Sequence, residues 1–152
     1  MNPIDPSQVR KDAETMFNNG LCCSESALLA LAKAQGIESP GIPAMATPFC
    51  GGMARTGGTC GALAGALMGA SLTLGRSSAS ESQKTAGRAT RRIVREFEQA
   101  FGSQDCHVLV GFDPADKATH SAFEREGRRD RCAIFTGAAT EMAARVINDS
   151  EK

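Results

Sequence analysis

Apolar side chains recur at intervals of three and four residues along most of this 152-residue chain, and no segment alternates convincingly with a period of two. Such intervals place apolar groups on one face of a helix, whereas strict alternation is typical of strands. Gly20 and Gly36 follow the first two periodic segments, as expected where helices end. The pattern predicts five longer helices, over residues of about 5–19, 23–35, 60–74, 79–101 and 131–147.

Shorter elements and one irregular connection complete the expected fold. A short turn or helix follows Cys106, and Asp113 begins another short helix to about residue 125. Residues 38–59 contain three Pro and five Gly, too many for regular structure. We therefore expect one all-α domain over residues 1–152, a bundle of about five to seven helices with a glycine-rich loop before the helix at Cys60. The apolar stripe expected for the last helix comprises Ile134, Phe135, Ala138, Met142 and Val146.

The charge balance and composition exclude several classes of partner. Lys plus Arg and Asp plus Glu each number 17, so the net charge is zero, and there is neither Trp nor Tyr. This composition gives no reason to expect binding to nucleic acid or to an anionic membrane. The longest apolar stretch, Cys60 to Leu74, is about 15 residues, shorter than the roughly 20 that span a bilayer. Without a signal pattern at residues 1–14, we expect a cytoplasmic protein.

The chain contains six cysteines, the one unusual feature of its composition, and they form no CxxC pair. Ordinary zinc ribbons and thioredoxin-like motifs use such pairs, so neither signature is present. Four of the cysteines instead fall at or near predicted helix starts, where unpaired N–H groups favour the thiolate and lower its pKa. These four are Cys23, Cys60, Cys106 and Cys132. Arginines before Cys132 would act in the same direction: Arg125, Arg128, Arg129 and Arg131.

Glycines cluster around the second of these four cysteines. Gly51 and Gly52 permit a positive φ and allow main-chain N–H groups to approach a ligand. Gly61, Gly65 and Gly69 recur every four residues, so they lie on one face of the predicted helix. Another helix or a cofactor could approach that face closely, and the Gly/Ala surface also makes a homodimer plausible. We therefore regard Gly51, Gly52, Gly61 and Gly65 as candidate cofactor-binding residues.

Residues 60–65, CGALAG, resemble the CGAxxG motif of the C_GCAxxG_C_C family of small redox-active proteins. Three further single cysteines complete a similar frame: Cys23 in GLCCSESALL, Cys106 in FGSQDCHVLVG and Cys132 in RCAIFTGAATEMA. The resemblance covers roughly residues 15–147 and implies that these four cysteines carry redox chemistry. The pattern also resembles the cysteine-bearing part of split-Soret cytochromes, which are associated with an iron–sulfur cluster. Because the chain has no C-x-x-C-H motif, covalent haem is not expected.

Three functions fit four converging cysteines. The first is a [2Fe–2S] or [4Fe–4S] cluster for electron transfer or redox sensing, exchanging electrons with a redox partner protein that the sequence does not identify. The second is a metal-free dithiol/disulfide couple, and the third a structural four-cysteine zinc site. In the second case the exchanging pairs would be Cys23–Cys60 or Cys106–Cys132, with Cys22 or Cys50 as resolving thiols. His107, next to Cys106, is a candidate substitute ligand or general base.

Overall fold

The chain folds into a bundle of helices. The computed structural model describes residues 1–111, 116–118 and 127–150, and within these ranges there are seven α-helices, one 3-10 helix and no strand. The all-α prediction is thus confirmed. The elements are α1 (Pro6–Asn18), α2 (Cys23–Ala34), η1 (Ala44–Phe49), α3 (Cys50–Met53), α4 (Gly61–Leu74), α5 (Lys84–Phe101), α6 (Cys106–Val110) and α8 (Arg128–Ser150). The helix expected from Asp113 to about residue 125 lies mostly outside the described residues.

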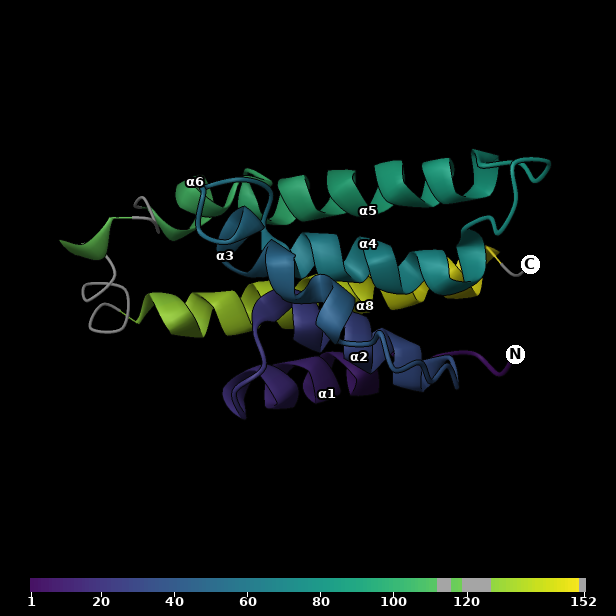
Figure 1. Ribbon diagram of the computed structural model, residues 1–152, viewed down its shortest axis with the longest axis horizontal. Helices are drawn as coiled ribbons and strands as arrows, with labels where there is room; N and C mark the ends of the chain where they lie inside the picture. Colours follow the sequence, from purple (N-terminus) through teal and green to yellow (C-terminus); the bar gives the residue numbers. More distant parts are fainter. Residues whose placement is uncertain (112–115, 119–126, 151–152) are drawn as a thin grey trace.

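The five longer helices run side by side along the long axis of the molecule, and α3 and α6 lie together at one end (Figure 1). Residues near both termini meet at the opposite end, where the Ile4 N–H donates to Asn148 Oδ1 at 2.9 Å and Asn148 Nδ2 donates to the Ile4 carbonyl at 2.8 Å. Helices α2, α4 and α8 run away from the end marked by α3 and α6, whereas α1 and α5 run toward it, so the starts of α2, α4, α6 and α8 all lie at that end.

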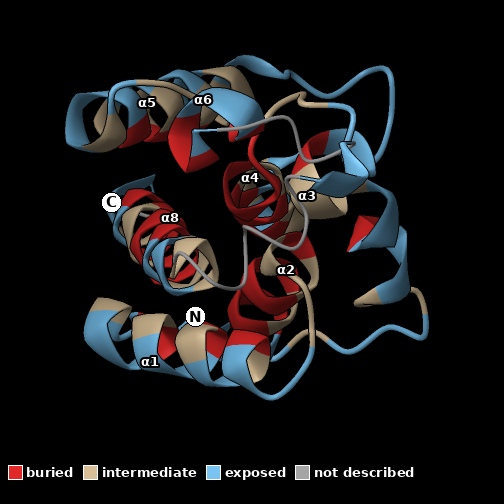
Figure 2. Cartoon of the chain, turned by 90° about the vertical axis from the view of Figure 1, so that its left-hand side faces the viewer, coloured by how far each residue is buried: buried red, intermediate tan, exposed pale blue. Residues whose placement is uncertain are grey.

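Helix α4 lies at the centre of the bundle, as the view from the α3/α6 end shows (Figure 2). Its small side chains allow neighbouring helices to approach on several sides, and half of its 14 residues are buried. Ile93 and Phe97 of α5 are fully buried against this centre. Phe101 and Phe135 extend the core through edge-to-face contacts, with ring centroids 4.9 Å apart. None of the described helices is long and apolar enough to span a membrane.

The expectation of no regular structure in residues 38–59 is wrong, because η1 and α3 lie within them. Pro48 fits inside η1, since a short 3-10 helix needs few N–H donors, and Ala46 anchors the segment in the core with no exposed surface. Gly51 and Gly52 have φ values of 67° and 71°, the left-handed conformation expected of them.

Two helix boundaries and one core residue also differ from expectation. Helix α5 begins at Lys84 rather than near residue 79, because the preceding polar segment forms local hydrogen bonds, such as Glu81 Oε2 accepting from the Ser77 N–H. Helix α8 begins at Arg128, earlier than residue 131. Ile134 is 49% exposed, since the buried face of α8 includes the hydroxyls of Thr136 and Thr140, each of which donates to a carbonyl one turn back.

Candidate redox centre

Each of the four predicted site cysteines comes from a different helix at the α3/α6 end of the bundle. Cys23 is the first residue of α2, Cys60 is the N-cap of α4 and Cys106 is the first residue of α6. Cys132 lies in the second turn of α8, so its expected position at a helix start is wrong, because α8 begins earlier than the sequence indicated. All four are free thiols in this structure.

A short antiparallel pairing holds Cys60 beside Cys106. The Cys60 N–H donates to the Gln104 carbonyl at 2.7 Å, and the Cys106 N–H donates to the Gly58 carbonyl at 2.8 Å. Thr59 and Asp105 form the isolated bridge between these two bonds. The sequence did not indicate this pairing, because two or three residues are too few to show a period.

Glycines allow the backbone to approach the cysteines closely. A Cβ atom added to Gly61 would lie 2.5 Å from Cys23 Sγ and 2.6 Å from the Phe49 carbonyl oxygen. A Cβ atom added to Gly52 would overlap Cys106 Cβ and lie 3.3 Å from Cys106 Sγ. These two positions therefore exclude any side chain, as was expected of backbone that approaches a ligand.

The backbone also donates hydrogen bonds to two of the sulfur atoms. The Cys23 sulfur is approached by the N–H groups of Gly51, Ser24 and Cys23 itself, each of which favours the thiolate and so lowers its pKa. The N–H groups of Leu63 and Ala62, in the first turn of α4, act in the same way on the Cys60 sulfur. Both sulfur atoms thus sit at the positive end of a helix, as the sequence predicted.

The net pKa shift of the four thiols is nevertheless upward, so the predicted lowering is wrong for the free thiols. Burial is the largest cause at each of them, and it raises the pKa of Cys106 to about 11 and that of Cys132 to about 12. Burial likewise raises the pKa of Cys23 and Cys60. Arg129 lowers the Cys132 pKa by less than burial raises it, because the thiolate loses its hydration inside the bundle.

Mutual repulsion shows that the four thiols share one electrostatic environment. A thiolate at Cys23 raises the pKa of the other three, and one at Cys106 raises the pKa of Cys60 and Cys132. The structure thus brings near one another four sulfur atoms that are up to 109 residues apart in the chain, from Cys23 to Cys132. Four thiolates could share this space only if positive charge were placed among them.

The spacing of these sulfur atoms is wider than a single zinc ion requires. Tetrahedral zinc with bonds of about 2.3 Å holds its sulfur ligands about 3.8 Å apart. Among the described residues, Cys22, Glu25 and Cys50 form a group of metal-ligating side chains whose ligand atoms all lie within 4.8 Å of one another. The four free thiols of the described residues form no group as tight as this. An iron–sulfur cluster distributes its thiolate ligands over several iron atoms and therefore accepts a wider spacing.

Cys22 and Cys50 form a disulfide next to this set of thiols. Their expected role as resolving thiols is not what the structure shows, because the bond joins these two residues and leaves the other four cysteines free. The Glu25 carboxylate lies beside the pair as part of the capping box of α2, accepting from the Cys22 N–H at 2.9 Å. With both sulfur atoms, this carboxylate forms a cluster that could hold a metal ion.

The remaining predicted residues lie near the cysteines but contact protein atoms. A Cβ atom on Gly65 would lie 2.8 Å from Ser24 Cα, so α2 occupies the space beside this glycine. Gly69 faces Leu31 of the same helix. The glycine face of α4 therefore packs within the chain, and the homodimer stays a prediction. His107 is exposed, with Nδ1 2.8 Å from the carbonyl oxygen of Gly57.

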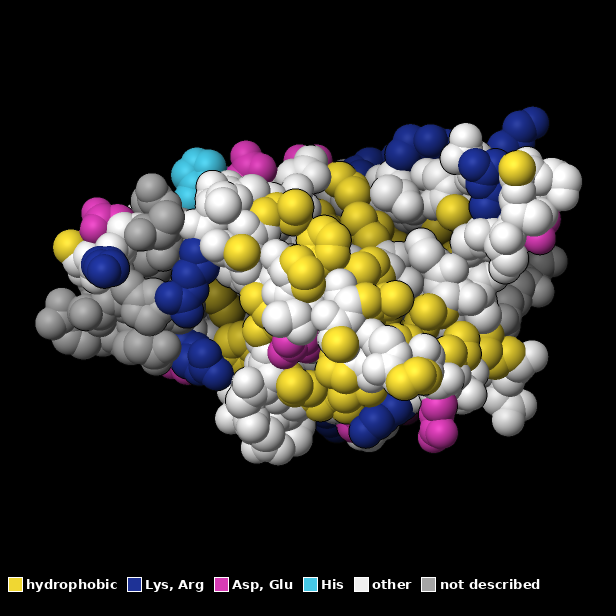
Figure 3. Space-filling model, viewed as in Figure 1, with side chains coloured by type: hydrophobic (Ala, Val, Ile, Leu, Met, Phe, Trp, Pro, Cys, Tyr) yellow, Lys and Arg dark blue, Asp and Glu magenta, His cyan; other side chains and the backbone are white. Residues whose placement is uncertain are grey.

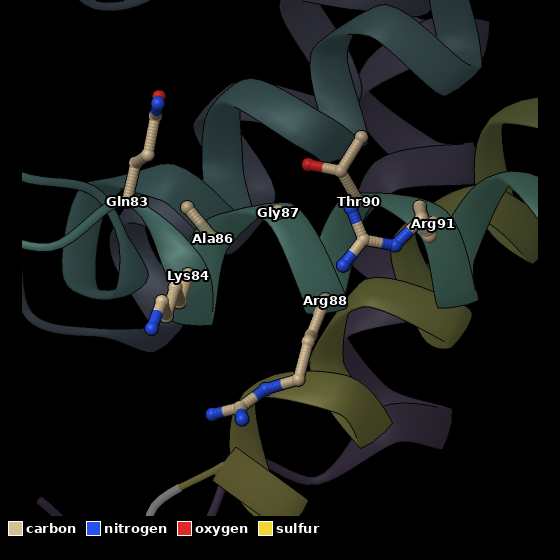
Figure 4. Close-up of a pocket in the computed structure, with 7 residues that line it drawn as sticks. All are labelled: Gln83, Lys84, Ala86, Gly87, Arg88, Thr90 and Arg91. Atoms are coloured by element: carbon tan, nitrogen blue, oxygen red, sulfur yellow. The ribbon is translucent and has the colours of Figure 1, made fainter.

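Two surface features lie away from the cysteines. A hollow of about 640 Å³ follows the start of α5, and its basic side chains, Lys84, Arg88 and Arg91, point in different directions rather than toward a common ligand (Figure 4). On the face that carries η1, apolar side chains gather near the middle, and Met45 of η1 is 53% exposed (Figure 3). None of the residues that line the hollow belongs to the cysteine site.

The fold and site define a small, all-helical, cysteine-rich protein in which four helices bring four free thiols together. Comparison with protein-family models gives the family itself. The chain belongs to the C_GCAxxG_C_C family, described as "Putative redox-active protein", whose model matches residues 21–146. This confirms the resemblance seen in the sequence. No curated protein and no solved structure matched the chain.

Proposed function

We propose that Cys23, Cys60, Cys106 and Cys132 together bind one iron–sulfur cluster, and that the protein transfers or senses electrons through it. The observation that carries this proposal is the convergence of four free thiols, each from a separate helix. They lie close enough that a thiolate at Cys23 raises the pKa of the other three. Membership of a redox-active family supports the same chemistry.

The residues present fit such a cluster. Four thiolates are its usual ligand number, and metal binding deprotonates thiols that burial keeps protonated. The N–H groups that reach the sulfur atoms of Cys23 and Cys60 are suitable donors to an anionic cluster, and Arg129 and Arg131 add positive charge near Cys132. When bound, the cluster would accept and release single electrons.

The chain's own residues would hold the cluster and shield it from water. Cys60 is only 5% exposed and Cys106 only 8% exposed, which limits access of solvent and oxidants to these ligands. Gly52 and Gly61 leave room for the cysteine side chains, because a side chain at either position would displace a cysteine.

A metal-free dithiol/disulfide protein is the second candidate, and the Cys22–Cys50 bond favours it because it shows that two cysteines of this end lie close enough to oxidise. A four-cysteine zinc site is disfavoured by the sulfur spacing described above.

Metal analysis of anaerobically purified protein tests the proposal. We expect iron and acid-labile sulfide in comparable amounts, with visible absorption that bleaches on reduction. Serine at any one of the four cysteines should remove most of the iron, whereas serine at both Cys22 and Cys50 should retain it. A colourless, iron-free protein after anaerobic reconstitution, with its four thiols still titratable, would overturn the proposal; one bound zinc per chain would favour the zinc alternative.

A further inference from the structure

Cys22 and Cys50 are the two cysteines that the proposed cluster does not use, and they form a disulfide. We propose that reduction of the Cys22–Cys50 disulfide opens a separate metal site, in which the two sulfur atoms and the Glu25 carboxylate bind one zinc ion. The site is therefore available only in the reduced protein, and its occupancy follows the redox state of the disulfide.

The three ligand atoms already lie together. The two sulfur atoms and a Glu25 carboxylate oxygen are all within 4.8 Å of one another, and the Cα atoms of Cys22 and Cys50 are 5.8 Å apart. Once the bond is cleaved, rotation about the two Cα–Cβ bonds can separate the sulfur atoms to the roughly 3.8 Å that two thiolates adopt on zinc. Two thiolates and a carboxylate are ligands that zinc binds readily.

Neighbouring groups orient the carboxylate. Glu25 Oε2 accepts from the Cys22 N–H at 2.9 Å, and Oε1 accepts from the Thr47 hydroxyl at 2.7 Å. Each oxygen keeps a lone pair for a metal, and such outer hydrogen bonds are typical of carboxylates that ligate metals. Glu25 thus serves as more than a helix cap, because it also faces both sulfur atoms.

The electrostatic setting favours the resulting negative charge. Two thiolates, one carboxylate and Zn²⁺ carry a net charge of −1, and Cys22 is the N-cap of the 12-residue helix α2, whose positive end faces the site. All three ligand residues are half-buried, so water can reach the fourth position of the metal.

An external dithiol supplies the electrons that reduce the Cys22–Cys50 disulfide. A dithiol reductant transfers two electrons and two protons, so that its own sulfur atoms form a disulfide while the Cys22–Cys50 bond breaks into two thiols. Binding of Zn²⁺ then releases one proton from each thiol. Oxidation reverses both steps and expels the zinc.

The test compares zinc bound to full-length protein in its oxidised and reduced states. Protein is incubated with zinc sulfate under argon, with or without a phosphine reductant, passed through a desalting column and analysed for zinc, iron and sulfide. Reduced wild type should retain one more zinc per chain than oxidised wild type, and one more than reduced Cys22→Ser/Cys50→Ser. Glu25→Gln should bind this additional zinc at least tenfold more weakly, whereas Glu38→Gln, which alters an exposed carboxylate beyond the C-terminal end of α2, should match wild type.

Equal zinc content in reduced wild type, oxidised wild type and the double serine variant would overturn the proposal. Should the serine variant fail to fold, a cobalt titration of wild type alone decides the question: reduction must add a thiolate-to-cobalt charge-transfer band, and an unchanged band refutes the site. Iron and sulfide in the same samples report on the four-cysteine centre, so failure of either proposal is recognised independently of the other.

Discussion

Replacing Gly65 with alanine tests a close backbone contact between α2 and α4. A Cβ atom on Gly65 of α4 would lie 2.8 Å from Ser24 Cα and 2.9 Å from Ser24 C, both backbone atoms of α2. The same Cβ atom would overlap the Ser24 carbonyl oxygen still more. Reaching an ordinary contact of 3.4 Å from the Cα atom alone would require α2 and α4 to separate locally by about 0.6 Å, and clearing the carbonyl oxygen requires more. Because backbone atoms cannot rotate aside as a side chain does, the helices themselves must move.

The cost can be compared with the benefit of alanine in a helix. Overpacking a core costs about 1–3 kcal/mol, and this backbone clash belongs at the upper end of that range. Alanine gains about 1 kcal/mol over glycine in a helix interior, so the net loss in the free energy of unfolding should be about 2 kcal/mol. Gly87 is the matched control, since a Cβ atom there would lie 3.5 Å from the flexible end of Arg91 and meet nothing else within 4 Å.

Urea unfolding followed by circular dichroism provides the measurement. Gly65→Ala should unfold at lower urea than wild type and Gly87→Ala at equal or higher urea, a separation of about 2–3 kcal/mol between the two variants. A Gly65→Ala protein as stable as Gly87→Ala would refute the claim that this glycine is required by helix packing.

Three further predictions concern the cysteine end and the first helix. Reducing Cys22–Cys50, which are 28 residues apart, should lower the free energy of unfolding by about 3–4 kcal/mol through loop entropy; thermal melts with and without reductant will measure this, and no change would contradict it. Gly61→Ala should displace Cys23 Sγ and lower the iron content of reconstituted protein, so unchanged iron would count against that contact. The pKa of Asp5 is lowered, chiefly by the hydrogen bond from the Ser7 side chain, so its stabilisation of α1 is present above the unfolded carboxyl pKa of about 3.9 and is lost as the pH falls through the lower folded value. Asp5→Ala should therefore be less stable than wild type at pH 7 and equal to it in strong acid, and a difference that persists in acid would contradict the assignment.

Periodicity was sufficient to predict α1 and α5 because each of them buries one apolar face. Helix α4 is surrounded by other helices, and its run of small apolar residues indicated it instead. Periodicity was misleading where burial depends on groups other than large apolar side chains. In α8, Thr136 and Thr140 are fully buried because their hydroxyls bond to the helix's own carbonyls, whereas the more apolar Ile134 is exposed. The count of apolar residues contains no information about such satisfied polar groups.

The candidate site was predictable only as a set of residues. The ordered cysteines and the CGAxxG motif indicated Cys23, Cys60, Cys106 and Cys132, and the glycines around Cys60 indicated close backbone approach. The direction of the thiol pKa shifts was not predictable, because helix position was known from the pattern but the degree of burial was not. Likewise, pairing of Cys22 with Cys50 depends on η1 and α3, two short elements that carry no periodic signal.

The reciprocal hydrogen bonds between Ile4 and Asn148 have a practical consequence. They hold the beginning and the end of the described chain next to each other, a full helix length away from the cysteines (Figure 1). A fluorescent reporter or an electrode linker attached at either extremity would leave the sulfur-bearing end facing solution. The molecule is therefore suited to oriented immobilisation, because the attachment point and the cysteines lie at opposite ends of the bundle.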